Sequence, residues 1–380
     1  MNRRILIIAG EASGDRHAAD LVAALRERDP ELQFSGIGGE AMRRAGVSLH
    51  YHLSDLAVLG ITEVIRHLPF IRNVLRHLKT LLRERIDAVI LVDYPGFNLR
   101  VARMAKKLGV PVIYYISPQL WAWGEGRVRK IRRDIDLLLV LFRFEVDFYK
   151  RHGIDATFVG HPLVDQLAPA SDEAAFRADH GLEQDRPILA LLPGSREMEV
   201  RNLLPVMAKA ARELVSRHPV IPVLGMADSL PDSLYDALLP GDLPVGRLRG
   251  ETHRLMRHAH TAMVASGTAT LELGYLETPM AVLYTVAPLT YRLGRMLVKI
   301  DNIALVNIVL GRTVVPELIQ HDVTVEGVAA AVEVFLSDPE RHRAVREALG
   351  GVRTALGEPG ASARAADAVL TFLKQGASAS

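Results

Sequence analysis

Two acidic side chains and a hydroxyl group lie in a short turn of small residues near the start of the chain. Residues 10–15 (GEASGD) follow the apolar run 5–9 and precede a segment with helical periodicity, which predicts the first strand, turn and helix of an α/β sheet. The turn has no basic residue and matches no phosphate-binding motif. It therefore favours sugar hydroxyls as the ligand of Glu11, Ser13 and Asp15. The alternative is that Ser13 or Asp15 only caps the following helix.

A further carboxylate, Asp93, comes directly after the apolar run 88–92. A side chain at the end of a parallel strand projects to where ligands bind, and the following Tyr-Pro-Gly bends the chain away. Asp93 is therefore predicted to be a general base that takes a proton from a hydroxyl group. Its alternative role is to cap the next helix. His161 is the rival base, and its own alternative role is to order the hinge between two domains.

Two turns in the second half of the chain are suited to bind an anion. Gly194, Ser195 and Arg196 follow a strand and open a helix, so backbone N–H groups, a hydroxyl and a guanidinium converge where the helix dipole favours negative charge. Residues 265–272 (ASGTATLE) repeat the order of strand, turn and helix. Glu272 is predicted to accept hydrogen bonds from the two vicinal hydroxyls of a ribose. The contacts predicted in this turn come from Ser266, Gly267 and Thr268.

The composition describes a folded chain of two domains. A chain of 380 residues is longer than a domain with a single hydrophobic core usually is. Of these residues, 49% are hydrophobic and 24% are charged, as in folded globular proteins. Cysteine is absent, which excludes disulfides and thiolate metal sites. No apolar run approaches the length of a membrane span, and neither a metal-ligand set nor a signal peptide is predicted. The net charge of +2, with no aromatic residues interleaved in the basic runs, argues against a nucleic-acid partner.

Apolar runs of strand length alternate with helical patterns along the whole chain. This alternation predicts α/β architecture, with two facing, doubly wound, Rossmann-like domains and a helical C-terminus. We expect an N-terminal domain at 1–165, a connector rich in Ala, Asp and Glu, and a second domain at 186–345. The helices of 346–380 are expected to pack on the first domain or on the partner subunit of a homodimer.

Five motifs occur in the order found in lipid A disaccharide synthases. They are residues 10–15 (GEASGD), 92–98 (VDYPGFN), 117–123 (SPQLWAW), 192–196 (LPGSR) and 265–269 (ASGTA). The chain resembles this family over nearly its whole length. The resemblance implies an inverting glycosyltransferase of GT-B fold, without a cofactor, that joins UDP-2,3-diacylglucosamine to 2,3-diacylglucosamine 1-phosphate. The products would be the β-1,6-linked disaccharide and UDP.

The resemblance also assigns roles to individual residues. The acceptor would lie near Glu11, Ser13, Asp15, Trp121 and His161. UDP would be held by Gly194, Ser195, Arg196, Ser266, Gly267, Thr268, Glu272 and Asn307. One departure from the family pattern is visible, because Val306 stands before Asn307 where the family usually has Pro-Asn.

Residues 64–85 form an amphipathic pattern with a basic polar face. Because acylated substrates reside in a bilayer, we expect this segment to bind the membrane surface, with the protein on the cytoplasmic face of the inner membrane. The predicted membrane contacts are Leu68, Phe70, Ile71, Leu75 and Leu78. The alternative is an ordinary crossover helix that buries the same apolar stripe against the sheet.

Two other functional classes remain open from the sequence. A UDP-sugar 2-epimerase also has two α/β domains with a UDP site in the second, but it has no need of a basic amphipathic helix. A non-catalytic protein that binds a UDP-sugar or a lipid would not require Asp93.

Overall fold

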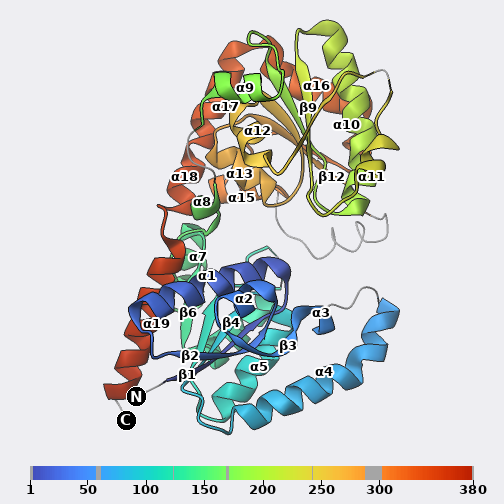
Figure 1. Cartoon of the computed structure of the whole chain (residues 1–380). Helices are drawn as coiled ribbons and strands as arrows, with labels where there is room; N and C mark the ends of the chain where they lie inside the picture. The colour runs from blue at the N-terminus through green and yellow to red at the C-terminus, as the bar shows by residue number, and fades with distance from the viewer. Residues whose placement is uncertain are drawn as a thin grey trace. The chain divides into compact units, whose positions relative to one another are not determined.

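The structure is a computed structural model that describes residues 3–56, 61–122, 124–167, 171–241, 243–286 and 302–378, without the side chains of 56, 61–68, 125 and 376–378. The chain forms two compact units (Figure 1). The first unit contains Met1–Asp165 and Leu356–Ser380, and the second contains Gln166–Ala355. The expected start of the second domain at residue 186 is therefore too late, because α9 (Glu173–Asp179) already belongs to the second unit and its Phe176 is fully buried.

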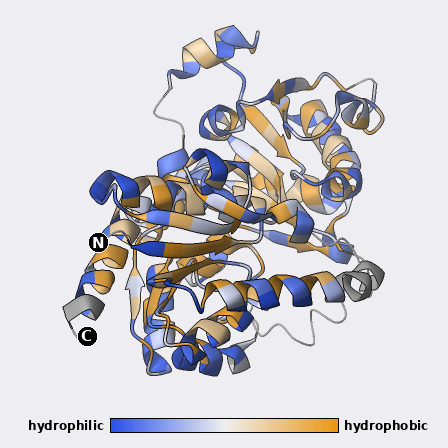
Figure 2. Ribbon diagram, turned by 60° about the horizontal axis from the view of Figure 1, so that its bottom comes forward, coloured by the Kyte–Doolittle hydropathy of each residue, from blue (hydrophilic) through white to orange (hydrophobic). Residues whose placement is uncertain are grey.

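The first unit contains a parallel sheet in the strand order β3-β2-β1-β4-β5-β6-β7. The strands are β1 (Arg4–Ala9), β2 (Gln33–Gly38), β3 (Ser48–His52), β4 (Ala88–Val92), β5 (Val112–Tyr115), β6 (Leu137–Val140) and β7 (Ala156–Phe158). β1 and β4 are buried on both faces, as expected of the centre of a parallel sheet covered by helices. The strands carry mostly hydrophobic colours in Figure 2.

Helices cover both faces of this sheet. Alternate strand residues, among them Leu6, Val89 and Tyr114, pack against one helical layer. That layer consists of α4 (Ile61–Leu81), α5 (Pro95–Lys107), the short η1 (Glu125–Arg127), α6 (Val128–Asp134) and α7 (Arg143–Arg151). α1 (Ala12–Arg28) and α19 (Ala361–Ser378) pack on each other and on strands of the same sheet. The shorter helices are α2 (Glu40–Arg44), α3 (Leu53–Leu56) and α8 (Leu163–Gln166).

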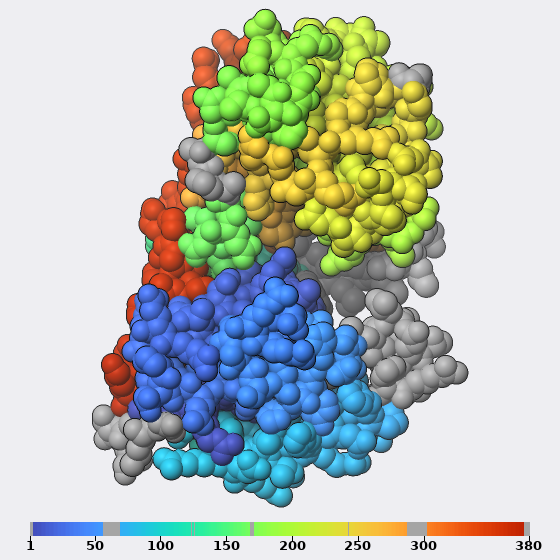
Figure 3. All heavy atoms as spheres, viewed as in Figure 1, coloured from blue at the N-terminus to red at the C-terminus, as the bar shows by residue number. Residues whose placement is uncertain are grey.

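The C-terminal helix is bound to the first unit by specific contacts. Arg28 of α1 forms an ion pair with Asp367 of α19 at 2.6 Å. Arg364 donates to the carbonyl of Val159 at 2.8 Å, and the N–H of Gly360 donates to Asp165 at 2.6 Å. In Figure 3 the red C-terminal residues lie beside the blue N-terminal ones on the surface of this unit.

The apolar stripe of α4 is mostly a core element. Val74 and Leu78 are fully buried in the cluster beneath the helical layer, and Phe70, Ile71 and Leu75 are half-buried against it. The expected membrane contact of Leu78 is therefore wrong, since a side chain with no exposed area cannot reach a lipid. The side chain of Leu68 lies outside the described residues. The exposed face of the helix is polar and carries Arg72, Arg76 and Lys79.

The second unit repeats the design with the parallel strand order β10-β9-β8-β11-β12-β13. Its strands are β8 (Ile188–Leu192), β9 (Ile221–Met226), β10 (Gly246–Arg249), β11 (Thr261–Ala265), β12 (Met280–Tyr284) and β13 (Glu317–Ile319). Its helices include α10 (Glu197–Arg217), α11 (Asp232–Asp236), α12 (Thr252–His258), α13 (Ala269–Tyr275), α15 (Leu305–Leu310), η2 (Gln320–Asp322), α16 (Val325–Ser337) and α17 (Pro339–Leu349). α18 (Gly351–Leu356) leads back to the first unit. Both units are thus Rossmann-like, and the C-terminus is helical, as the sequence predicts.

Candidate active site

The candidate site of the first unit lies at the edge of the sheet where the parallel strands end. β1 and β4 are neighbours, and their last residues, Ala9 and Val92, are paired. From β1 the chain crosses to β2 on one side, whereas from β4 it crosses to β5 on the other. Ligands of doubly wound sheets bind where the strand order changes direction in this way. The topology therefore places the acidic turn of residues 10–15 next to Asp93.

The backbone at Asp93 has an unusual conformation. Asp93 and Tyr94 are both left-handed, with φ of 47° and 48°, which costs about 1–2 kcal/mol for a residue with a Cβ. Hydrogen bonds on both sides maintain it. The N–H of Asp93 donates to the carbonyl of Tyr115 at 3.1 Å. The carbonyl of Asp93 accepts from the Tyr114 hydroxyl at 2.6 Å and from Nδ2 of Asn98 at 2.7 Å.

Two further residues fix this turn. Gly10 is required by the ring of Tyr94, because a Cβ at position 10 would lie 2.2 Å from its Cδ1 atom. Asn98 is fully buried, and its Nδ2 also donates to the carbonyl of Val92 at 3.1 Å. The sequence analysis included Asn98 in a motif without giving it a role. The sequence signal for such a role is the polar amide of Asn98 among the apolar residues of the first turn of α5.

The carboxyl group of Asp93 has a raised pKa. Burial is the main cause, the negative charge of Glu11 adds to it, and a hydrogen bond from the Tyr94 backbone opposes it; together they raise the pKa to about 6. The ionised form therefore predominates at neutral pH but remains basic enough to accept a proton. A carboxyl group with this pKa at a ligand-binding edge is a candidate general base.

The other acidic residues of the turn have different roles. Glu11 and Ser13 are exposed at the start of α1, so both are accessible to a ligand. Asp15 is buried, and its oxygens accept the backbone N–H groups of Gly39 (2.5 Å), Ala41 (3.0 Å) and Met42 (3.2 Å). The expected acceptor contact of Asp15 is therefore wrong. Its carboxylate instead stabilises the N-terminus of α2, a helix other than the one that the sequence suggested.

Trp121 is held by a buried carboxyl group that the sequence analysis missed. Glu145 accepts from Ser117 Oγ at 2.9 Å, from Trp121 Nε1 at 3.3 Å, and from the N–H groups of Leu141 and Phe142 at 3.1 Å. Burial, opposed by these hydrogen bonds, raises the pKa of Glu145 to about 7. The indole is half-buried, so part of it stays accessible beside the loop that Glu145 anchors. Trp123 lies outside the described residues.

His161 is a buried, neutral imidazole. Its Nδ1 accepts the N–H of Leu163 at 3.1 Å, and its ring lies 5.3 Å from that of Phe142. Burial and, to a smaller extent, the charge of His17 lower the pKa of His161 to about 3. These contacts order the chain after β7. They favour the structural role of His161 over its role as a base.

The candidate site of the second unit lies at the corresponding edge. Leu192 at the end of β8 pairs with Val264 of the neighbouring β11, and the strand order again changes direction between these two strands. The turn of Gly194, Ser195 and Arg196 follows β8, and the turn 266–268 follows β11. The two turns that the sequence predicts to bind an anion are therefore adjacent.

Glu199 organises the first of these turns. Gly194 has a φ of +107°, and a Cβ there would lie 2.3 Å from Oε2 of Glu199. This oxygen accepts the N–H groups of Ser195 at 3.2 Å and Arg196 at 3.3 Å, and Oε1 accepts from the Arg196 guanidinium at 2.9 Å. Sequence reasoning missed Glu199, although a glutamate three residues after a helix cap is the signal of a capping box.

In the second turn, Glu272 lies in the first turn of α13. Its carboxylate is 3.6 Å from Nε2 of His253 on α12 and is only 16% exposed. The Glu272 carboxylate raises the pKa of His253 against the effect of burial. Ser266 and Gly267 are half-buried and Thr268 is exposed, so this turn presents small polar groups beside a positioned carboxylate.

Asn307 has no capacity left for a ligand. It is fully buried; Nδ2 donates to Val315 O at 2.9 Å and to Glu317 Oε1 at 2.7 Å. Oδ1 accepts the N–H groups of Val314 at 2.8 Å and Val315 at 3.1 Å. The expected UDP contact of Asn307 is therefore wrong. The amide fixes the chain that leads into β13.

Comparison with known proteins identifies the family. The family model described as lipid-A-disaccharide synthetase matches residues 5–372. A lipid-A-disaccharide synthase of Syntrophus aciditrophicus is 47% identical over 378 residues, which cover 98% of this chain and 99% of that protein. One of Myxococcus xanthus is 43% identical over 378 residues, covering 98% of each. The chain belongs to the lipid-A-disaccharide synthase family. It is accordingly a UDP-sugar glycosyltransferase of lipid A biosynthesis.

Solved structures agree with the fold at much lower sequence identity. Acinetobacter baumannii MurG aligns with a TM-score of 0.59 at 14% identity over 97% of this chain and 99% of that chain. A putative UDP-N-acetylglucosamine 2-epimerase from Listeria monocytogenes aligns with a TM-score of 0.64 at 14% identity, covering 99% and 98%. This likeness supports the GT-B fold alone, and the full-length sequence relatives decide the family.

The pKa of Asp93 predicts the pH dependence of this family member. If Asp93 must be ionised, kcat/KM rises as the pH increases through about 6. Replacing Glu11 by Gln removes a negative charge that raises the Asp93 pKa, so the acidic limb of the profile should move to lower pH. Glu31→Gln, at an exposed site beyond the far end of α1, should leave the limb in place. A limb that does not move in Glu11→Gln would show that Asp93 is not the titrating group.

Proposed function

We propose that the chain transfers 2,3-diacylglucosamine from UDP to 2,3-diacylglucosamine 1-phosphate, with Asp93 as the general base. The single observation that carries this assignment of the base is the partly exposed carboxyl group of Asp93, held in a left-handed turn with a pKa of about 6. Membership of the lipid-A-disaccharide synthase family supports the substrates.

In this proposal the first unit activates the acceptor. Asp93 takes the proton of the acceptor's 6-hydroxyl as its oxygen attacks the anomeric carbon of the donor sugar. The bond from that carbon to the diphosphate breaks, and UDP leaves with the electron pair, so a single displacement inverts the anomeric centre. Glu11 and Ser13 are exposed beside Asp93 and would position acceptor hydroxyls, and the accessible part of Trp121 would contact the sugar.

The second unit would hold the donor. Arg196, the N–H groups of the 194–196 turn and the 266–268 turn would stabilise the leaving diphosphate. The carboxylate of Glu272, positioned by His253, would accept the two ribose hydroxyls. In the structure the N–H groups of Ser195 and Arg196 donate to Glu199. Phosphate binding by this turn therefore requires either that the ligand replace Glu199 as their acceptor or that only the Arg196 guanidinium contact the phosphate.

The UDP-sugar 2-epimerase that the sequence left open differs from the transferase in its chemistry, and the solved 2-epimerases share only the fold with this chain. The two functions differ in their need for an acceptor. Incubation with radiolabelled UDP-diacylglucosamine should release UDP only when the lipid acceptor is also present. Release of UDP without the acceptor, or recovery of an epimerised sugar nucleotide, would contradict the transferase.

Asp93→Asn tests the base directly. The amide keeps the shape of the side chain but cannot take the proton, so turnover should fall by about 10²–10⁴-fold while UDP affinity stays nearly unchanged. Asp155→Asn, at an exposed acid remote from the turn, serves as a control and should retain activity. If Asp93→Asn keeps more than about a tenth of the activity, the base lies elsewhere.

The division of roles in the donor site predicts different nucleotide affinities. Arg196→Ala should lower the affinity for UDP by about tenfold and the affinity for UMP much less, since only UDP carries the outer phosphate. Glu272→Ala should weaken both nucleotides alike, because both contain the ribose. Arg201→Ala, one turn further along α10, is the control. Calorimetry makes the comparison, and equal losses of UDP and UMP in Arg196→Ala would refute its assignment to the outer phosphate.

We also propose that the chain acts at a membrane surface through residues 70–76 of α4. Among the described residues, no helix combines the length and the apolar character needed to cross a bilayer. The acylated substrates, the half-buried Phe70 and Ile71, and the exposed Arg72 and Arg76 on the same helix support peripheral binding.

Vesicle flotation with thermal melting separates membrane contact from packing. Replacing Phe70 and Ile71 by Ser should reduce flotation with anionic vesicles and lower the melting temperature only slightly. Leu78→Ala is the matched core variant. It should keep its vesicle binding while losing about 2–5 kcal/mol of stability, since a fully buried leucine is truncated. Unchanged flotation of the Phe70 and Ile71 variant would reject this part of the proposal.

A further inference from the structure

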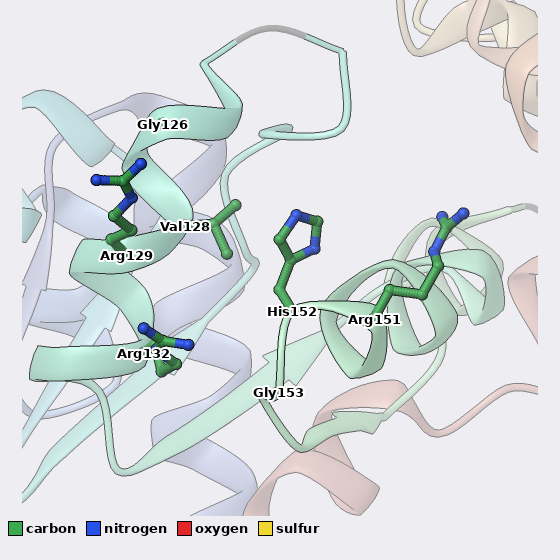
Figure 4. A pocket seen from close by; sticks show the side chains of 7 residues that line it. All are labelled: Gly126, Val128, Arg129, Arg132, Arg151, His152 and Gly153. Carbon is green, nitrogen blue, oxygen red and sulfur yellow. The ribbon is translucent and has the colours of Figure 1, made fainter.

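A basic pocket of about 710 Å³ lies between α6 and the C-terminal end of α7 in the first unit (Figure 4). Its lining residues are Gly126, Val128, Arg129, Arg132, Arg151, His152 and Gly153. α7 ends at Arg151, and the chain then enters β7 at Ala156. Arg151–Gly153 thus lie toward the edge where the strands begin. Gly126 and Val128 lie at the start of α6, on the side where β5 ends, and none of the lining residues is among the candidate active-site residues described above.

The charges around this pocket are uncompensated. It has three arginines and a histidine in its lining and no acidic residue. Within the described part of the chain, no carboxylate lies within ion-pair distance of Arg129, Arg132 or Arg151, and all three are exposed. Guanidinium groups gathered without a counter-ion repel one another, and an anion bound among them would remove that repulsion.

The acidic residues near the pocket form ion pairs with other cations. Arg103 and Arg133 both pair with the buried Asp134, at 3.0 and 2.7 Å, and Lys106 pairs with Asp136. The acids of this layer thus pair with Arg103, Lys106 and Arg133 and are divided from Arg129, Arg132 and Arg151 of the pocket. This division is what an anion site requires, since a nearby carboxylate would compete with the ligand.

The lining side chains come from two helices and the segment that follows the second. Figure 4 shows Val128 of α6 and His152 facing one another, with Arg129 and Arg132 on α6, whereas Arg151 extends away along α7. The ring of His152 lies 4.8 Å from that of Phe148, and its Nδ1 lies 2.9 Å from the Phe148 carbonyl oxygen, so its position is fixed. Guanidinium groups present paired N–H donors that match two oxygens of a phosphate.

We propose that this pocket binds a phosphate group through Arg129 and Arg132, with His152 on its other side. The ligand is a phosphate monoester or diester, which either a small phosphorylated molecule or the headgroup of an anionic lipid supplies. Every residue that forms the site belongs to the first unit, whereas the donor-binding turns belong to the second.

The test compares two double variants of equal charge change. Arg129→Gln with Arg132→Gln removes the pocket's cations, and Arg100→Gln with Lys107→Gln removes two exposed cations of α5 that do not line it. Calorimetry at low ionic strength with inorganic phosphate and with glycerol 3-phosphate measures binding. The pocket variant should lose about tenfold or more in affinity, and the α5 variant should bind like the parent chain. Unchanged melting curves confirm that both variants fold.

Vesicles distinguish the two sources of the phosphate. Flotation with phosphatidylglycerol in phosphatidylcholine, compared with phosphatidylcholine alone, should fall in the pocket variant but not in the α5 variant if the ligand is a lipid headgroup. Flotation that is equal in both variants, together with the loss of phosphate binding, assigns the site to a small phosphorylated molecule. Equal phosphate affinity in the two variants, or no binding by the parent chain, would overturn the proposal.

Discussion

The candidate site of the first unit depends on the left-handed backbone at Asp93 and Tyr94. This conformation is unfavourable by itself, and it persists because buried groups from β5 and α5 hold the carbonyl and N–H of Asp93. The same turn presses the Tyr94 ring onto position 10, where only glycine fits. One strained turn thus determines where the carboxyl group points, which residue can stand at the end of β1, and how closely Glu11 approaches.

Closeness to Glu11 has an electrostatic consequence. Burial raises the pKa of Asp93, and the negative charge of Glu11 at the same edge of the sheet raises it further. The result is an acid that is ionised at neutral pH yet basic enough to accept a proton. The second unit has the opposite arrangement, in which a glutamate caps the N–H groups of the anion-ready turn and holds its arginine. A doubly wound sheet thus presents an acidic edge in one unit and a donor-rich edge in the other.

Most strands were predictable from the sequence, but β2 and the edge strands β3 and β10 were not. Runs such as 88–92 and 261–265 are continuous apolar segments because helices cover both faces of these strands. β3 (SLHYH) and β10 (GRLR) lie at sheet edges and carry polar residues, and β2 contains Gly36, whose Cβ would collide with the Ile7 carbonyl oxygen. Since part of an edge strand faces water, its sequence lacks the apolar run by which a strand is found.

The sequence by itself determined the α/β class, the strand-turn-helix motifs and the family, because these depend on local order along the chain. It also placed Asp93, Arg196 and Glu272 at strand ends or helix starts, where ligands of such sheets bind. Only the tertiary structure decided which polar groups remain available. Asp15 caps a distant helix, Asn307 is saturated by the chain before β13, and Leu78 is sealed in the core. Burial and hydrogen-bond partners come from residues far apart in sequence, so no local pattern records whether a side chain faces a ligand or the protein interior.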